Sequence, residues 1–412
     1  MKKRKTLVLV LFLFLALPGK AENQGDKKYQ FQLKGGARMV IREDAHSATA
    51  SLNLWTPAGY AEEGEEHGLA FLTAKVIKES IRARLSARGL RQVDCSCCTG
   101  PDFSFFSLQV PSAAVEKTMV AIGEALRSPD FSLTEAKKNE LLAEINLSKK
   151  APLRLAFNLF LNRTFPNHPY GRAPEGETAS VSSLDAEKAK RFLIVHCPAS
   201  ELSFVAVGGP SSGQLASTFS YAFNGLSNET FTAVPLPESS PLSGIATASL
   251  EAGPSAIVLG SSGPNFTQFR QGVALDLLAS ILKRALSGEG QDCLSWWDFR
   301  RGSGLFAIAF QGDRKTIDKM AERTLILLEN VRNGSFSPDE LSRAQASLLA
   351  AFAESNGNDL ARQLGFFNTL GSPVALDTYP PVVRQITPAE IQEAAQRWLS
   401  PSRIVVAKVI GQ

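Results

Sequence analysis

The sequence predicts an α+β protein of two homologous αβ domains, each a mostly antiparallel sheet packed with helices. Two observations predict this fold class. The chain of 412 residues repeats itself at an offset of about 204 residues. Each half also shows the same order of strands, a long helix, strands, further helices and a final strand. With 44% hydrophobic residues, the chain can bury a core in each half.

Three anchor segments carry the internal repeat. Each occurs once per half at nearly the same spacing, which is typical of a duplicated unit. They are a Gly that opens a long helical pattern (Gly68 and Gly272), a Ser-x-x-Glu capping box (132–135 and 337–340), and an apolar strand that ends in Gly (198–208 and 401–411).

The first half, 22–226, contains two segments with strand-like composition, 48–55 and 103–110. Between them, apolar residues recur at helical spacing from Gly68 onward. A helix with this pattern buries a broad face. The first half is therefore expected to pack a long helix against a sheet.

The second half, 246–412, repeats this logic. A helix is expected through Leu277 to Leu282, and a strand through 305–310. The segment 227–245 between the halves holds three prolines and several serines, a composition that resists both helix and strand. We expect it to be a linker.

The first 21 residues have the pattern of a cleavable signal peptide. A basic stretch, 2–5, precedes an apolar run, 7–17, and small residues stand before Glu22. The run is too short for the roughly 20 residues of a membrane-spanning helix, so no span is expected in the mature chain. We predict export, to a bacterial periplasm in preference to a eukaryotic secretory route. The alternative is an uncleaved anchor.

The charge balance argues against nucleic-acid binding. The chain has 44 basic and 40 acidic residues. Five of the basic residues lie in the predicted signal, which leaves the mature chain close to neutral. Binding to a phosphate backbone requires a basic surface, so no nucleic-acid partner is expected.

Cysteine and histidine are sparse. The cluster 95–98 holds three cysteines and is open to two interpretations: a soft-metal or redox element, or small residues packed beside a strand. The pairing of Cys197 with Cys293 is left open. His168 is expected to form a hydrogen bond in a turn.

Several local patterns resemble the insulinase-type (pitrilysin-like) metallopeptidase family in its short two-domain form. The resemblance covers nearly the whole mature chain. The matching patterns are Gly68-Leu69-Ala70 at the start of the family's metal helix, Thr99 and Asp102 on the strand that follows, His168-Pro169-Tyr170-Gly171 in an internal turn, and Arg300 with Gly304-Leu305 in the second domain.

The resemblance implies that the metal site of this chain is degenerate. Active members carry H-x-x-E-H on the metal helix and a glutamate ligand on a later helix. At the histidine positions this chain has Phe71 and Lys75, and at the general-base position it has Ala74. Only the third ligand persists, as Glu144. No metal and no catalytic residue are therefore expected in this chain, and zinc is expected only in a partner subunit.

The short relatives often work as pairs of unlike subunits, in which one chain holds zinc and the other supplies an arginine and a tyrosine that position the substrate. The resemblance places the arginine at Arg300, which is either a substrate-binding residue or part of a structural ion pair. The tyrosine position falls on Ala307, beside Phe306, so no phenol hydroxyl remains there.

The sequence thus favours a non-catalytic, peptide-binding subunit of an exported heteromeric zinc peptidase, partnered by a homologous zinc-bearing subunit. The alternative is a catalytically inert scaffold or peptide-binding module with the same fold. Whether the chain shares in any enzymatic activity depends on that partner. An independent hydrolase is disfavoured, because no Gly-x-Ser-x-Gly or Cys/His signature is present.

Overall fold

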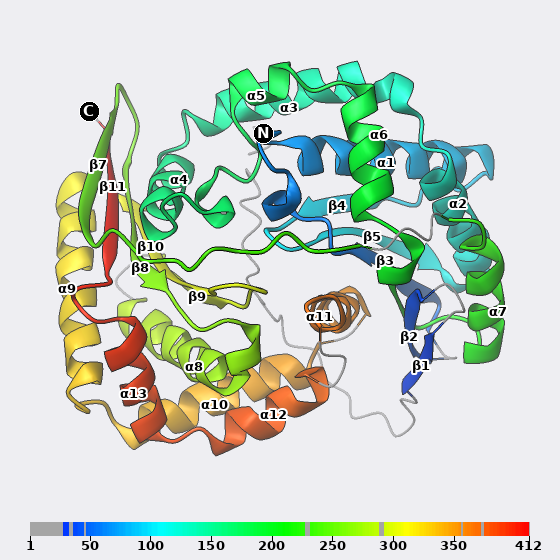
Figure 1. The fold of residues 1–412 in the computed structure, drawn as a ribbon. Coiled ribbons are helices and arrows are strands. Elements are labelled where there is room, and N and C mark those ends of the chain that lie inside the picture. Colours follow the sequence, from blue (N-terminus) through cyan, green and yellow to red (C-terminus); the bar gives the residue numbers. More distant parts are fainter. Residues whose placement is uncertain are drawn as a thin grey trace, which may run out of the picture.

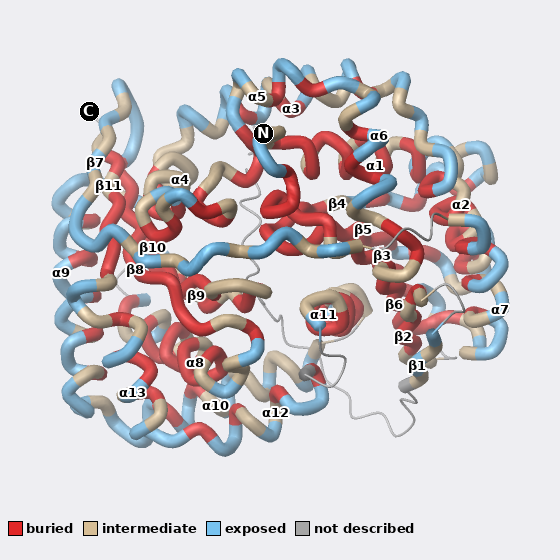
Figure 2. The backbone as a smooth tube through the Cα atoms, in the orientation of Figure 1, coloured by how far each residue is buried: buried red, intermediate tan, exposed pale blue. Residues whose placement is uncertain are grey.

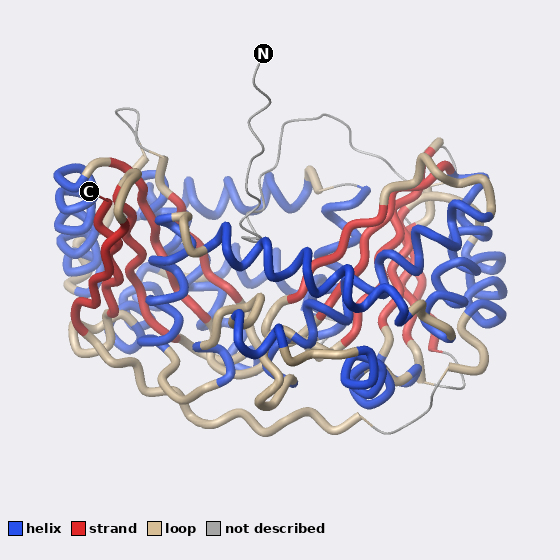
Figure 3. Tube along the Cα trace, turned by 90° about the horizontal axis from the view of Figure 1, so that it is seen from above, coloured by secondary structure: helices blue, strands red, loops and turns tan. Residues whose placement is uncertain are grey.

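The computed structural model describes residues 28–32, 36–44, 47–226, 231–287, 292–355, 357–371 and 375–411. Two β-sheets, each covered by helices, form the molecule (Figure 1). Seen from above, the sheets stand at opposite ends, with helices outside and between them (Figure 3). This architecture confirms the predicted α+β class. The predicted signal peptide, 1–21, and positions 227–230 of the predicted linker lie outside the described residues.

The first sheet has six strands in the order β1-β2-β6-β3-β5-β4. Its strands are β1 (Lys28–Gln32), β2 (Arg38–Arg42), β3 (Thr49–Thr56), β4 (Cys95–Thr99), β5 (Ser104–Pro111) and β6 (Ser203–Val207). The helices of this half are α1 (Leu69–Ala87), α2 (Val115–Arg127), α3 (Thr134–Ser148), α4 (Pro152–Thr164), α5 (Thr178–Ser182), α6 (Ala186–His196) and α7 (Ser212–Ala222).

The second sheet has five strands in the order β7-β11-β8-β10-β9. Its strands are β7 (Gly244–Leu250), β8 (Ser255–Ser262), β9 (Leu294–Asp298), β10 (Leu305–Gly312) and β11 (Val405–Gly411). The helices are α8 (Phe269–Leu286), α9 (Arg314–Arg332), α10 (Pro338–Ala353), α11 (Gly357–Thr369), α12 (Ala375–Gln385) and α13 (Pro388–Trp398).

The two sheets show the predicted repeat directly. Apart from β1, the first sheet has the order β2-β6-β3-β5-β4, and the second sheet repeats it as β7-β11-β8-β10-β9. Each contains one parallel pair at the same place, β2 with β6 and β7 with β11. The long predicted helices are α1 and α8, whose inward turns are buried (Figure 2). The halves therefore have the same topology.

One anchor of the repeat is wrong in detail. Ser337 and Glu340 form the predicted capping box at the start of α10. In the first half, the corresponding Ser132 caps nothing with its side chain. Instead the side chain of Asp130 accepts a hydrogen bond from the backbone N–H of Ser132, and α3 begins at Thr134 without a side-chain cap. The nearer acceptor Asp130 takes the place that the sequence pattern assigned to Ser132.

Each half lends one helix to the sheet of the other half. Helix α4 of the first half packs on β8 and β11 of the second sheet, where Phe160 and Leu161 are fully buried. Helix α11 of the second half packs on β3 and β6 of the first sheet. The two helices occupy equivalent places in the repeat. Two of the hydrophobic clusters therefore contain residues of both halves, which ties the halves together.

Aromatic side chains join α11 to the first sheet. The ring of Phe366 contacts Trp55 and Phe103 at centroid distances of 6.4 and 5.7 Å. Gly365 lies beside Phe366, and a Cβ atom at this position would stand 1.9 Å from the indole Nε1 of Trp55. The glycine is therefore needed for the close approach of α11 to β3.

We expect Gly365→Ala to destabilise the protein. Alanine is the better helix former, but its methyl group overlaps the buried Trp55, and overpacking costs about 1–3 kcal/mol. Urea unfolding monitored by far-UV circular dichroism measures the change in free energy. Gly213→Ala in α7 is the control, because a Cβ atom there meets nothing within 4 Å. If both variants are equally stable, the helix does not approach the sheet this closely.

Residues 231–243, the described part of the predicted linker before β7, contain no helix or strand, and side chains of the first half hold them in place. Glu62 accepts a hydrogen bond from the backbone N–H of Val234 at 2.9 Å. Arg163 donates to the carbonyl oxygens of Leu242 and Ser243. The segment therefore follows the surface of the first half on its way to the second sheet.

Candidate functional site

A buried carboxylate fixes the start of α1, the helix that carries the degenerate motif. Glu63 accepts hydrogen bonds from the backbone N–H groups of Gly68 and Ala70 at 2.9 and 2.8 Å. Such a carboxylate satisfies donors that a helix leaves free at its N-terminus. Gly68 has φ +93°, a conformation that side chains with a Cβ rarely adopt. Burial raises the pKa of Glu63 to about 8 in spite of these hydrogen bonds.

The structure brings the four predicted positions to adjoining helices. Phe71, Ala74 and Lys75 lie on α1, and Glu144 lies on α3, which packs against α1. Ala74 is buried in the core of the first half, with 3% of its surface exposed. Phe71 is partly buried against a neighbouring apolar cluster. These two side chains therefore serve packing.

Lys75 and Glu144 form an ion pair across the two helices. The Lys75 Nζ atom donates a hydrogen bond to Glu144 Oε1 at 2.8 Å. Glu144 is the residue that the resemblance assigns as the remaining metal ligand. An ammonium thus links α1 to α3 at the position where the resemblance predicts the metal of active relatives. Two positive charges do not share such a place, so the ion pair and a zinc ion exclude each other.

The surroundings offer no substitute ligand set. Among the described residues, no group of three or more His, Cys, Asp or Glu side chains is arranged to hold a metal ion. Burial raises the pKa of Cys97, although Lys78 and Lys75 oppose the shift. A protonated thiol is a poor metal ligand.

We expect Lys75→Glu to weaken the link between α1 and α3. The substitution places two carboxylates side by side. Because the Glu144 side chain is 56% exposed, the cost is limited to about 1 kcal/mol. The double variant Lys75→Glu with Glu144→Lys restores an ion pair and should recover part of that cost. A thermal unfolding double-mutant cycle in low salt measures the coupling. A coupling of zero would show that the pair contributes nothing.

Arg300, the predicted substrate-binding residue, is buried. Only 3% of its side chain is exposed, and its Nε atom donates to Asp298 Oδ2 at 2.8 Å. The guanidinium lies over the rings of Phe165 and Tyr170, 5.3 and 5.0 Å from their centroids. This geometry favours the structural ion pair that the sequence left open, because a ligand has no access to the group. Ala307, at the tyrosine position, is fully buried.

A polar network that the sequence did not reveal surrounds Arg300. The Tyr170 hydroxyl donates to Asp102 Oδ1 at 2.5 Å and accepts from the backbone N–H of Gly302 at 2.9 Å. Asp102 Oδ2 accepts from the backbone N–H of Arg301 at 2.9 Å. Two turns of the first half therefore hold the loop between β9 and β10 of the second half. Burial raises the pKa of Asp102 and moves that of Tyr170 well above its usual value.

His168 supports this network as the predicted turn residue. Its Nδ1 atom accepts a hydrogen bond from the backbone N–H of Tyr170 at 3.0 Å. Burial and the nearby Arg300 lower the pKa of His168 to about 4, so the ring is neutral at physiological pH. The signal that could have located the network is the motif 168–171 itself, because the hydroxyl of Tyr170 requires a hydrogen-bond partner when the ring is buried.

The cysteines show neither a metal site nor a disulfide. All five are free thiols, including Cys197 and Cys293. Burial raises the pKa of Cys95 above its usual range and that of Cys98 to about 12. In the cluster 95–98, Cys95 and Cys98 pack in the sheet as small apolar residues. This outcome agrees with the packing interpretation of the cluster.

Comparison with known proteins places the chain among peptidase-like folds. No protein-family model matches the sequence. The chain is 26% identical over 211 residues to cytochrome b-c1 complex subunit 1, mitochondrial, of Caenorhabditis elegans. That match covers 49% of this chain and 44% of the subunit, so the chain spans less than half the length of this relative.

Two solved structures match almost the whole chain. The crystal structure of a peptidase M16 inactive domain from Pseudomonas fluorescens has a TM-score of 0.82 at 17% identity, and the match covers 94% of this chain and 98% of that one. A protease from Helicobacter pylori has a TM-score of 0.83 at 16% identity, covering 93% and 99%. The protein therefore has the two-domain fold of the insulinase-type (M16) peptidases.

Proposed function

We propose that this chain is the non-catalytic, peptide-binding subunit of an exported heteromeric zinc peptidase, most consistent with a bacterial periplasm. It acts together with a homologous subunit that carries an intact H-x-x-E-H helix and the zinc ion. The observation that supports the proposal is the Lys75–Glu144 ion pair, which lies at the positions that the resemblance assigns to two metal ligands. One of the matched structures is itself an inactive domain of this fold.

Peptide binding is proposed at the edges of the sheets. Strand β4 ends the first sheet, and β9 ends the second. An edge strand offers backbone N–H and C=O groups that an extended peptide can pair with. Arg300 does not reach such a peptide in this structure, because it lies in the loop that follows β9 with its side chain buried against Asp298. Substrate contacts are therefore assigned to backbone edges and to neighbouring exposed side chains.

The experiment combines the purified chain with a zinc-bearing homologue encoded in the same genome. Hydrolysis of a fluorogenic peptide and zinc content by elemental analysis are measured for each chain alone and for the mixture. We expect no turnover by this chain alone and a clear gain in turnover at equimolar mixing, abolished by a chelator. Chelator-sensitive hydrolysis by the isolated chain would refute the non-catalytic role.

A second candidate is an inert scaffold within a larger assembly. The similarity to a protein named as a subunit of the cytochrome b-c1 complex favours it. Within the described part of the chain, no helix has the length and apolar character needed to cross a membrane. Pull-down followed by size-exclusion chromatography separates the candidates. A stable complex that lacks any zinc-bearing homologue supports the scaffold, and a complex with one supports the peptidase subunit.

A further inference from the structure

The second half contains a cavity of about 600 Å³. Strand β9 and helices α8, α10, α11 and α12 supply its lining. Sites for small ligands typically enclose roughly 300–1,000 Å³, so the cavity is large enough for a molecule of several residues.

This cavity occupies the place in the second half that the degenerate metal position occupies in the first. By the repeat, α8, α10 and β9 correspond to α1, α3 and β4. Ala279 stands on α8 where Lys75 stands on α1, and Leu348 lies on α10 next to Leu349, the position that corresponds to Glu144. Both Ala279 and Leu348 line the cavity. The space that an ion pair bridges in the first half is therefore open in the second.

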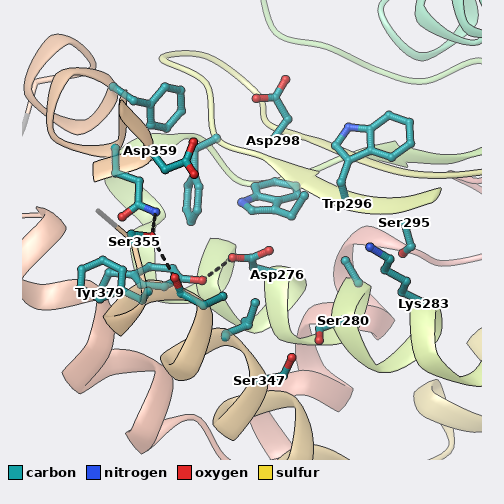
Figure 4. A pocket seen from close by; sticks show the side chains of 18 of the residues that line it. Asp276, Ser280, Lys283, Ser295, Trp296, Asp298, Ser347, Ser355, Asp359 and Tyr379 are labelled. Carbon is teal, nitrogen blue, oxygen red and sulfur yellow. Dashed lines mark hydrogen bonds between the residues drawn. The ribbon is translucent and has the colours of Figure 1, made fainter. Parts of the chain in front are cut away.

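The charged groups of the cavity are separated along α8. Asp276 and Lys283 both line it and lie seven residues apart, which corresponds to about two helical turns and about 10 Å. Figure 4 shows Asp359 toward one side of the cavity, Asp276 near the middle beside the Tyr379 hydroxyl, and Lys283 with Ser295 toward the other side. Aromatic residues form much of the remaining surface: Trp296, Trp297, Phe299, Phe352, Phe366, Phe367 and Tyr379.

Burying the charged form of Asp276 in this environment costs free energy. Among the described residues, the hydroxyl of Tyr379 is its one hydrogen-bond donor, at 2.5 Å from Oδ2. Burial raises the pKa of Asp276 to about 6. Because this pKa is higher in the folded state, the free energy of unfolding falls as the pH rises from the ordinary pKa of an aspartate through about 6. Above that pH the folded state must hold a desolvated charge. A bound cation would offset that cost.

We propose that this cavity binds a short peptide of about three residues with free termini. Three extended residues span at most about 10 Å, which matches the separation of Asp276 and Lys283 along the helix. The terminal ammonium pairs with Asp276 and Asp359, and the terminal carboxylate pairs with Lys283. An apolar central side chain packs on the indole ring of Trp297, since the ring of Trp296 on the other face of β9 contacts Phe157. The site does not depend on a zinc-bearing partner.

The test uses the full-length mature chain and four forms of the tripeptide Ala-Phe-Ala: free, N-acetylated, C-amidated and capped at both ends. Isothermal titration calorimetry and tryptophan fluorescence report binding. Each cap removes one charge-assisted contact, so we expect each to weaken binding about tenfold or more, and the doubly capped form to show no measurable binding.

Variants assign each terminus to its partner. Lys283→Met should weaken the free and acetylated peptides but not the amidated one. Asp276→Asn and, separately, the exposed-site variant Asp359→Asn should weaken the free and amidated peptides but not the acetylated one. Lys319→Met and Glu322→Gln remove charges from exposed positions on α9, outside the cavity, and should change nothing.

Two results would overturn the proposal. One is equal binding of the free and doubly capped peptides, which would mean that the charged termini are not recognised. The other is the absence of binding by the free peptide to wild-type protein that unfolds cooperatively. Because Asp359 is exposed, its variant tests the charge contact even where Asp276→Asn fails to fold.

Discussion

Arg300→Ala is expected to lower the free energy of unfolding by about 3 kcal/mol. The substitution leaves Asp298 without the cation that now pairs with it at 2.8 Å, and breaking a buried pair on one side typically costs about 3–5 kcal/mol. It also removes the guanidinium from the rings of Phe165 and Tyr170. Because 19% of the Asp298 side chain stays exposed, water moderates the loss. Urea unfolding followed by fluorescence measures it.

Arg270→Ala is the matched control. Arg270 also pairs with a carboxylate, that of Glu390 at 2.6 Å, but 46% of its side chain is exposed, so the expected loss is about 1 kcal/mol or less. The comparison also decides the role of Arg300. A substrate-contacting arginine would leave stability unchanged and weaken peptide binding. If Arg300→Ala unfolds at the wild-type urea concentration, the structural ion pair is not its main role.

Zinc binding is expected to return when two histidines are placed on α1. The double variant Phe71→His with Lys75→His removes the ammonium at the metal position and puts two imidazoles one helical turn apart. Glu144 on α3 then completes three protein ligands, as in catalytic zinc sites. We expect about one zinc per chain after dialysis, by elemental analysis. Zinc should also raise the unfolding temperature, since it binds the folded state.

The zinc prediction has two controls. Wild-type protein should retain no stoichiometric zinc, because Lys75 occupies the position. Adding Glu144→Gln to the double variant should weaken zinc binding by at least about tenfold, the loss that even an outer contact of a metal site typically causes. Ala74 stays unchanged, so no peptidase activity is expected from the variant. Failure of the double variant to bind zinc would show that α1 and α3 are no longer spaced for a metal.

Several features of the fold were predictable because they depend on local pattern. The helices α1 and α8 follow from apolar residues at helical spacing, and the strands β5 and β10 from runs of strand-forming residues. The repeat of about 204 residues indicated two similar halves, and the matching strand orders show them. The Ser132 cap was wrong because a competing acceptor, Asp130, lies two residues away.

The place of each candidate site residue was less accessible to pattern. Lys75 could be excluded as a zinc ligand from its identity alone, yet its partner Glu144 lies 69 residues away on another helix. Whether Arg300 faces a substrate or a core depends on rings contributed by Phe165 and Tyr170 from the other half. Such contacts join segments that are far apart in the sequence, and neither composition nor residue spacing shows which segments come into contact.

The sequence by itself determined the class of fold and its duplication, because these follow from residue type and local periodicity. Only the tertiary structure decided that α4 and α11 pack on the sheet of the other half, that Lys75 and Glu144 form an ion pair between α1 and α3, and that a cavity lies beside α8 in the second half. The physical reason is that burial and pairing depend on which side chains lie close together, and folding brings together residues that are far apart in the sequence.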